Sequence, residues 1–180
     1  ANSLGKKGIQ EGTEPFAMAY RNAVLKLEEW SRRERLPLVF WVVDEPREKL
    51  KNSWNRSLAE TLVLLKALDG IEGLRTTVTP MADTESGVDY GPLADAVDVL
   101  QTHPWSNSKR LMERARARGV PVWSYNAGAD RLSFGFHPWA ARLQGRYQWH
   151  YAFWKAPYDI FAEGWGVTFP SPEGPLPTPE

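Results

Sequence analysis

Hydrophobic positions along the chain alternate between helical and extended spacing. After Pro15, large apolar residues recur every three or four positions, at Phe16, Tyr20, Val24, Leu27 and Trp30. This spacing predicts a helix over residues 14–33 with those side chains on its buried face. The next apolar run, 38–43, is continuous and rich in β-branched and aromatic residues, which is typical of a buried strand.

The same alternation continues toward the C-terminus. We expect further helices at 58–68, 90–96, 107–119 and 131–143, and further strands at 74–79, 97–102, 120–125 and 147–153. Strands that alternate with helices in this way form a parallel sheet. Because no glycine-rich phosphate fingerprint follows a predicted strand, a nucleotide-binding doubly wound sheet is disfavoured. The fold class that we expect is α/β, a (β/α) barrel of the TIM type.

Five predicted βα units make only a partial barrel, since eight-stranded barrels typically take roughly 250 residues. The chain has 180 residues, enough for one domain with a sizeable core. We expect a polar N-terminal segment at 1–13, the partial barrel at 14–168 and a Pro-rich tail at 169–180. Five prolines in the twelve residues of that tail exclude a helix or a central strand, so the tail is expected to be extended.

Composition and charge narrow the possible partners. With 22 acidic and 22 basic residues the net charge is zero, so nucleic acid and anionic membranes are not the expected partners. The absence of cysteine leaves the compartment open, and the N-terminus lacks the apolar core of a signal peptide. We therefore expect a soluble chain, secreted or periplasmic if a leader has been removed.

Aromatic residues are unusually frequent, with nine Trp, six Tyr and seven Phe. Flat indole faces suit the C–H faces of sugar rings, and each indole N–H seeks a hydrogen-bond partner. Carbohydrate is therefore the first ligand class to consider. The three histidines do not have the spacing of a metal site, so neither a metal nor another cofactor is expected.

Asp44 and Glu45 stand at the end of the buried strand, directly before Pro46. (β/α) folds keep their chemistry at the carboxyl ends of their strands. The alternative is that Asp44 caps a turn and Glu45 is solvated. The other predicted strand ends carry polar and aromatic groups that suit a neutral polar substrate such as a sugar: Thr79, Met81, Asp83, Thr102, His103, Trp105, Tyr125, Asn126, Asp130, Trp149, His150 and Tyr151.

An ordered set of motifs resembles a known family. The set comprises Trp41-Val-Val-Asp-Glu-Pro46, Val97-Asp-Val with His103-Pro-Trp105, Val122-Trp-Ser-Tyr125, and Arg131 followed by Gly135, Trp139, Gly145 and Trp149. Together they resemble the catalytic barrel of glycoside hydrolase family 123 and the bacterial barrel proteins of the DUF4091 type. The resemblance runs over residues 16–174, in the order of the C-terminal half of the barrel.

The resemblance implies exo-acting hydrolysis of β-linked N-acetylhexosaminides of the N-acetylgalactosamine type, with the substrate's 2-acetamido group as nucleophile. Glu45 matches the family's general acid/base, and Asp44 matches the neighbour that orients the acetamido group. Adjacent carboxylates cannot readily flank the anomeric carbon at the ~5–5.5 Å or ~6.5–9.5 Å separations of ordinary pairs, which favours such a mechanism. In it Glu45 would be protonated at rest, its pKa raised by burial and by the charge of ionised Asp44.

Around these two acids, strand position and the resemblance suggest a set of substrate-binding residues: Trp41, His103, Trp105, Tyr125, Asn126, Arg131, Trp149 and Tyr151. Tyr125 would hydrogen-bond the acetamido oxygen, and Trp105 or Trp149 would form a wall of the pocket. Two of these residues have a plain structural alternative, because His103 could be a core histidine and Arg131 could brace a loop.

Alternative functions remain open from the sequence. A conventional retaining glycosidase would need Asp83 or Asp130 as nucleophile. A non-catalytic carbohydrate-binding or structural partial barrel would keep the fold and the aromatic mouth without hydrolysis. A barrel enzyme that abstracts protons is a third possibility. Another chain or a missing segment could complete the barrel, or the chain could form an open sheet. Among these functions we expect a glycosidase with a carbohydrate ligand.

Overall fold

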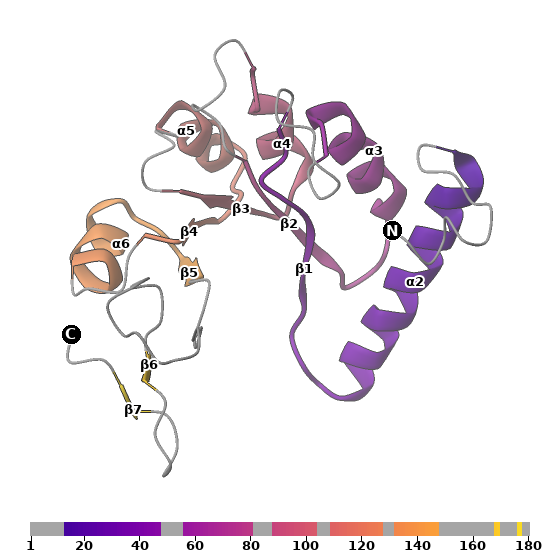
Figure 1. The fold of residues 1–180 in the computed structure, drawn as a ribbon, viewed down its shortest axis with the longest axis horizontal. Coiled ribbons are helices and arrows are strands. Elements are labelled where there is room, and N and C mark those ends of the chain that lie inside the picture. Colours follow the sequence, from indigo (N-terminus) through magenta and orange to yellow (C-terminus); the bar gives the residue numbers. More distant parts are fainter. Residues whose placement is uncertain are drawn as a thin grey trace.

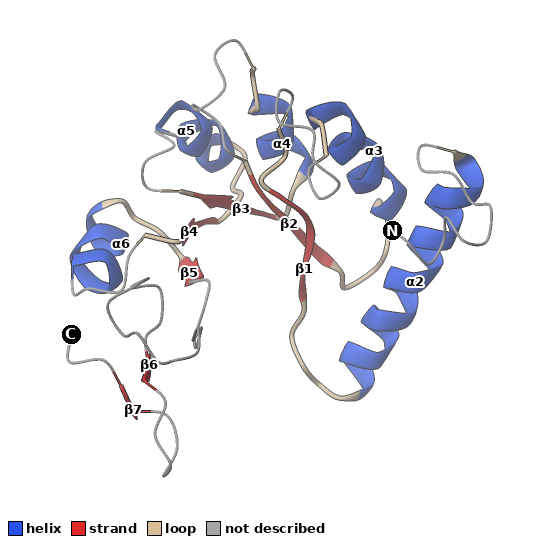
Figure 2. Ribbon diagram, viewed as in Figure 1, coloured by secondary structure: helices blue, strands red, loops and turns tan. Residues whose placement is uncertain are grey.

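The computed structural model describes residues 13–47, 56–80, 88–103, 109–127 and 132–147, and the backbone of 168–169 and 176–177. Over these residues the protein has an α/β fold, in which a five-stranded parallel sheet is covered by helices (Figure 1, Figure 2). This confirms the expected α/β class. None of the described helices is long and apolar enough to cross a membrane.

The sheet follows the order of the sequence. Its strands are β1 (Val39–Asp44), β2 (Arg75–Thr79), β3 (Val99–Thr102), β4 (Val122–Tyr125) and β5 (Gly145–Tyr147). They lie in the order β1-β2-β3-β4-β5, and each neighbouring pair is parallel. All five carboxyl ends therefore lie at one edge of the sheet.

Helices precede and connect these strands. They are α2 (Glu14–Arg33), α3 (Leu58–Leu68), α4 (Gly91–Ala96), α5 (Lys109–Ala117) and α6 (His137–Ala140), the last preceded by a π-helical segment, Leu132–Phe136. At the start of α3, local sequence determines where the helix begins. The Ser57 hydroxyl accepts the Glu60 N–H at 3.2 Å, and the Glu60 carboxylate accepts the Ser57 N–H at 2.7 Å. This capping box satisfies two of the free N–H groups at the helix start.

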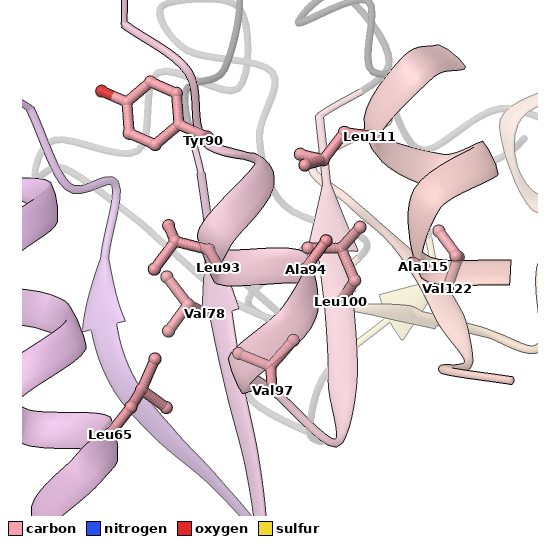
Figure 3. Packing of buried hydrophobic residues seen from close by; sticks show 10 residues of the cluster. All are labelled: Leu65, Val78, Tyr90, Leu93, Ala94, Val97, Leu100, Leu111, Ala115 and Val122. Carbon is pink, nitrogen blue, oxygen red and sulfur yellow. The ribbon is translucent and has the colours of Figure 1, made fainter. Parts of the chain in front are cut away.

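The main core lies between the sheet and helices α3, α4 and α5, as Figure 3 shows. Val78, Leu100 and Val122 of three consecutive strands point into it, and each has no exposed surface. The helices contribute residues that are themselves buried: Leu65, Leu93, Ala94, Leu111 and Ala115. Burial of this aliphatic face fixes the register of the sheet, since a shift by one residue would turn it outward.

The opposite face of the sheet is polar and aromatic. Successive strand residues point to opposite faces, so the neighbours of the core valines and leucines carry this second face. Thr79 and Gln101 are buried there, and the Thr79 hydroxyl donates to the Gln101 side-chain oxygen at 3.1 Å. In β1 the pairing with β2 shifts between Trp41 and Val43, which inserts one extra residue as a β-bulge just before the strand ends.

The predicted buried face of α2 is partly wrong. Phe16 and Val24 are buried as expected, but Leu27 is 36% exposed and Trp30 is 43% exposed. Glu28 and Ser31 are buried instead. Both can be buried because hydrogen bonds within the protein replace the hydrogen bonds to water that they lose. The Glu28 carboxylate accepts from Arg32 at 2.8 Å, and the Ser31 hydroxyl donates to the Leu36 carbonyl.

The region after β4 also differs from expectation. The predicted helix at 131–143 is a π-helical segment followed by one short turn, α6, and β5 begins at Gly145 rather than at 147. Gly145 lies against the Trp123 indole, where an added Cβ would be 2.6 Å from Nε1. Residues 148–153 of the predicted strand lie outside the described residues. In the Pro-rich tail, β6 (Thr168–Phe169) pairs antiparallel with β7 (Leu176–Pro177).

Candidate functional site

Asp44 and Glu45 lie where β1 leaves the sheet. Glu45 has a left-handed backbone, with φ of 44°, a conformation that costs a residue with a Cβ about 1–2 kcal/mol. Residues held in this way concentrate at functional sites, where surrounding contacts must stabilise them. One such contact anchors the next residue, because the buried Tyr90 hydroxyl donates to the Pro46 carbonyl at 3.0 Å.

The Glu45 carboxylate is held through both of its oxygens. His103 Nε2 lies 2.9 Å from Oε1, and Arg47 Nη2 lies 2.7 Å from Oε2. A carboxylate is an acceptor, so the imidazole and guanidinium nitrogens donate to it. His103 follows β3 and its side chain is 1% exposed. The expected meeting of the β1 and β3 ends is therefore confirmed.

These contacts give the two acids different proton affinities. The hydrogen bond from His103, and then that from Arg47, holds the pKa of Glu45 below its usual value despite opposing burial. Burial raises the pKa of Asp44 to about 6, and the adjacent Glu45 charge adds to this rise. By its accessible surface, however, Asp44 is an exposed residue, so water weakens the effect of burial on its carboxyl group.

The sequence-based assignment of protonation was therefore wrong. It made Glu45 the protonated acid and Asp44 the ionised one, whereas the structure favours the proton on Asp44. The reason is that His103 and Arg47 both donate hydrogen bonds to the Glu45 carboxylate. Hydrogen bonds to the ionised form of an acid stabilise that form. Within the described residues Asp44 forms no salt bridge, so its pKa reflects mainly its burial and the charge of Glu45.

Aromatic rings form a wall beside the acids. The Trp41 ring meets Tyr125 edge-on at 5.0 Å and Tyr147 edge-on at 5.3 Å, measured between ring centroids. Tyr125 and Tyr147 stack at 5.7 Å, and the His103 ring contacts Tyr125 at 4.8 Å. We call Trp41, Tyr125 and Tyr147 the aromatic wall. Its rings come from β1, β4 and β5, so distant segments build one surface.

Two polar groups of this surface are suited to binding a ligand. Burial and the negative charges of Asp44 and Glu45 raise the pKa of Tyr125, which keeps its hydroxyl protonated and able to donate. The Trp41 indole nitrogen is buried and has no hydrogen-bond partner among the described residues. Buried N–H groups normally find a partner, and a ligand oxygen is one group that could fill this role.

The structure brings together five of the residues expected from the sequence: Trp41, Asp44, Glu45, His103 and Tyr125. Asn126 follows Tyr125, shares the left-handed conformation with φ of 50°, and hydrogen-bonds the Tyr125 side chain. Thr79 and Thr102 end β2 and β3 as expected, and both are buried. The other expected residues lie outside the described part of the chain: Met81, Asp83, Trp105, Asp130, Arg131, Trp149, His150 and Tyr151.

Two residues of the site were missed at the sequence level. Arg47 binds Glu45, and its position two residues after the acid pair was the available signal. Tyr147 belongs to the aromatic wall and is the last residue of β5. The sequence pattern predicted it as the first residue of a strand at 147–153, so it was not among the expected strand ends. In the described ranges, no group of three or more His, Asp or Glu side chains is placed to hold a metal ion.

Chemically, the arrangement offers one carboxyl group that exchanges its proton near pH 6 and one that stays ionised. Such a pair can donate a proton and stabilise positive charge in the same reaction. No family model matches the chain, and no match to it is found among curated proteins. The resemblance to glycoside hydrolase family 123 therefore stays a prediction.

Proposed function

We propose that the protein is a glycoside hydrolase that removes β-linked N-acetylhexosamine residues, of the N-acetylgalactosamine type, from chain ends. One observation carries the proposal. Two adjacent carboxyl groups with opposite shifts in pKa leave β1 together, beside the wall of Trp41, Tyr125 and Tyr147. Pairs of acids whose surroundings separate their pKa values are typical of acid/base catalysis, and aromatic surfaces suit sugar rings.

The proposed scaffold is a (β/α) barrel of the TIM type, of which this chain supplies five strands. Support comes from the strand order, which follows the sequence without reversal, whereas a doubly wound sheet reverses at a switch point. The helices α3, α4 and α5 lie on one side of the sheet (Figure 1), as the outer ring of a barrel does. Further strands from another segment or chain would close the barrel.

In the proposed reaction Asp44 is the general acid. It donates its proton to the leaving glycosidic oxygen while the bond from that oxygen to C1 breaks. The carbonyl oxygen of the substrate's 2-acetamido group forms a bond to C1 and gives a cyclic oxazolinium. Water then attacks C1, the ring opens, and Asp44 takes up the proton of the water. A pKa near the working pH suits a group that both gives and takes a proton.

Glu45 is proposed to stabilise the positive charge that develops on the acetamido group. A carboxylate has about four acceptor sites, and the contacts with His103 and Arg47 use one on each oxygen. A further site can therefore accept the acetamido N–H. Tyr125 would donate its hydroxyl to the acetamido oxygen, and Trp41 with Tyr147 would contact the apolar face of the sugar.

The proposal is tested by varying the leaving group of an aryl β-N-acetylgalactosaminide. Asp44→Asn removes the acid, so we expect roughly 100-fold or greater loss with a poor leaving group. With a dinitrophenyl leaving group, which departs without a proton, the loss should be much smaller. Glu45→Gln should lower both rates by similar factors, because its role does not involve the leaving oxygen.

Steady-state rates for both substrates decide between these outcomes. Equal losses for the two substrates in Asp44→Asn would refute its role as the acid. Exposed Glu72, far along the chain from the acid pair, provides the matched control Glu72→Gln, which should leave both rates unchanged.

A non-catalytic carbohydrate-binding domain is the second candidate. It is favoured by the neutralisation of Glu45, whose two oxygens already contact His103 and Arg47. In that case an N-acetylhexosamine titration should change the tryptophan fluorescence of the wild-type protein without any turnover. Trp41→Phe should reduce the fluorescence change, because Trp41 belongs to the aromatic wall.

A further inference from the structure

The buried imidazole beneath the acid pair suggests a role beyond filling the core. We infer that His103 is a positioning residue, which fixes the Glu45 carboxylate relative to the sheet and thereby separates the tasks of Glu45 and Asp44. This inference rests on the proposed function for its consequence in catalysis. Its structural part concerns the free protein and can be tested without any substrate.

The two side chains bound to Glu45 come from different parts of the fold. Arg47 lies two residues after Glu45 on the same segment, so it moves with that segment. His103 follows β3, and β2 lies between β3 and β1. Of the two side chains that the structure shows bound to the Glu45 carboxylate, only His103 belongs to another strand. It therefore sets where the carboxylate lies relative to the sheet.

His103 is also more tightly packed than Arg47. The His103 residue is 2% exposed, and its ring contacts the Tyr125 ring at 4.8 Å with the planes at 64°. The Arg47 side chain is 23% exposed and has more freedom to move. Glu45 itself has a strained left-handed backbone. A buried, ring-packed donor is the contact best suited to hold such a residue in one orientation.

His103 also affects the charge of Glu45. Among the described residues, the titratable and charged groups that interact with Glu45 are Asp44 on its own segment, Arg47 just after it, His103 after β3 and Tyr125 of β4. Among the groups that stabilise the ionised form of Glu45, the hydrogen bond from His103 contributes most. Without it, the proton affinities of Glu45 and Asp44 would approach each other, and both carboxyl groups would compete for one proton.

The test compares two variants by carboxyl-carbon NMR titration of Glu45 and Asp44. His103→Leu removes the donor and should raise the proton affinity of Glu45 about tenfold or more. His103→Gln keeps an N–H donor and should restore most of the wild-type titration. His137 belongs to α6, which lies well apart from β1 in Figure 1. The matched control His137→Leu should leave both titrations unchanged.

A Glu45 titration that is the same in wild type and His103→Leu would overturn the inference. If His103→Leu does not fold, nitrogen NMR of the wild-type protein tests the contact instead. The Nε2 of His103 should carry a proton that is hydrogen-bonded to the Glu45 carboxylate. An unprotonated Nε2 would refute the contact. A wild type that hydrolyses no amino-sugar glycoside defeats the proposed function alone. Where turnover is measured, His103→Leu should move the acid limb of the pH–rate profile to higher pH, as simple loss of packing would not.

Discussion

At the scale of single residues, neighbours in sequence acquire different chemistry from their partners in space. Asp44 and Glu45 are both carboxylic acids at the end of one strand, and only Glu45 meets His103 and Arg47. The structure therefore favours a proton on Asp44 and a charge on Glu45. In the proposed enzyme this difference assigns the proton transfer to Asp44.

The raised pKa of Asp44 has a consequence for stability. An unfolded Asp has a pKa near 3.8, and the folded value is about 6. The folded protein therefore binds more protons than the unfolded chain between these pH values, and its stability falls as the pH rises through them. Asp44→Asn should raise the free energy of unfolding at pH 7, by less than about 1 kcal/mol because the exposed edge of the side chain is screened by water.

Urea denaturation at pH 4 and pH 7 measures this effect. The gain should be clear at pH 7 and nearly absent at pH 4, where most of the Asp44 carboxyl is protonated in the folded state. Glu72→Gln serves again as the exposed control. A gain of equal size at both pH values would show that the charge of Asp44 is not the cause.

The sequence predicted the acid pair and its aromatic surroundings, but not the protonation. Strand position was enough to bring Asp44, Glu45, His103 and Tyr125 to one edge, because parallel strands share that edge. Protonation depends on which nitrogen lies within 3 Å of which oxygen, and the positions of His103 and Arg47 set this for Glu45. No spacing along the chain encodes such a contact.

At the scale of secondary-structure elements, periodicity located the helices and strands well where packing and propensity agree. Helices α2 and α3 have the predicted bounds, and strands β1 to β4 lie within two residues of theirs. Prediction was poorer where a buried polar side chain or close contact between backbone and side chain determines the structure. Glu28 is buried because Arg32 pairs with it, and β5 starts at Gly145 because only a residue without a side chain fits beside Trp123.

Gly145 gives a direct test of the packing between β4 and β5. Gly145→Ala would place a Cβ 2.6–2.7 Å from the Trp123 indole, so the ring or the strand must move. We expect a loss of about 1–3 kcal/mol in the free energy of unfolding, as for other overpacked sites. The displaced β5 should also disturb Tyr147 and weaken the aromatic wall.

Gly135→Ala is the matched control, because an added Cβ there meets nothing within 4 Å. Both variants are compared by chemical denaturation, with near-ultraviolet circular dichroism as the probe of the aromatic wall. Equal stability of Gly145→Ala and the wild type would contradict the close packing described for β4 and β5.

At the scale of the whole molecule, one sheet separates two kinds of surface. The aliphatic face packs against α3, α4 and α5 (Figure 1, Figure 3). The opposite face carries Thr79 and Gln101, which are buried and hydrogen-bonded to each other. Burying polar groups costs free energy unless they are hydrogen-bonded, as Thr79 and Gln101 are. In the proposed barrel this face would line the interior, and the carboxyl ends of the strands, with Asp44 and Glu45, would form the mouth.

The central claim is that Asp44 supplies a proton to a departing sugar oxygen while Glu45 stays charged. The most direct measurement is the pH dependence of kcat/KM for an aryl β-N-acetylgalactosaminide, using the wild-type protein with any chain that copurifies with it. The account predicts that kcat/KM falls about tenfold for each unit of pH above about 6, as Asp44 loses its proton, and that this decline disappears in Asp44→Asn. A rate that stays constant from pH 5 to pH 9, or no turnover at any pH, would contradict it.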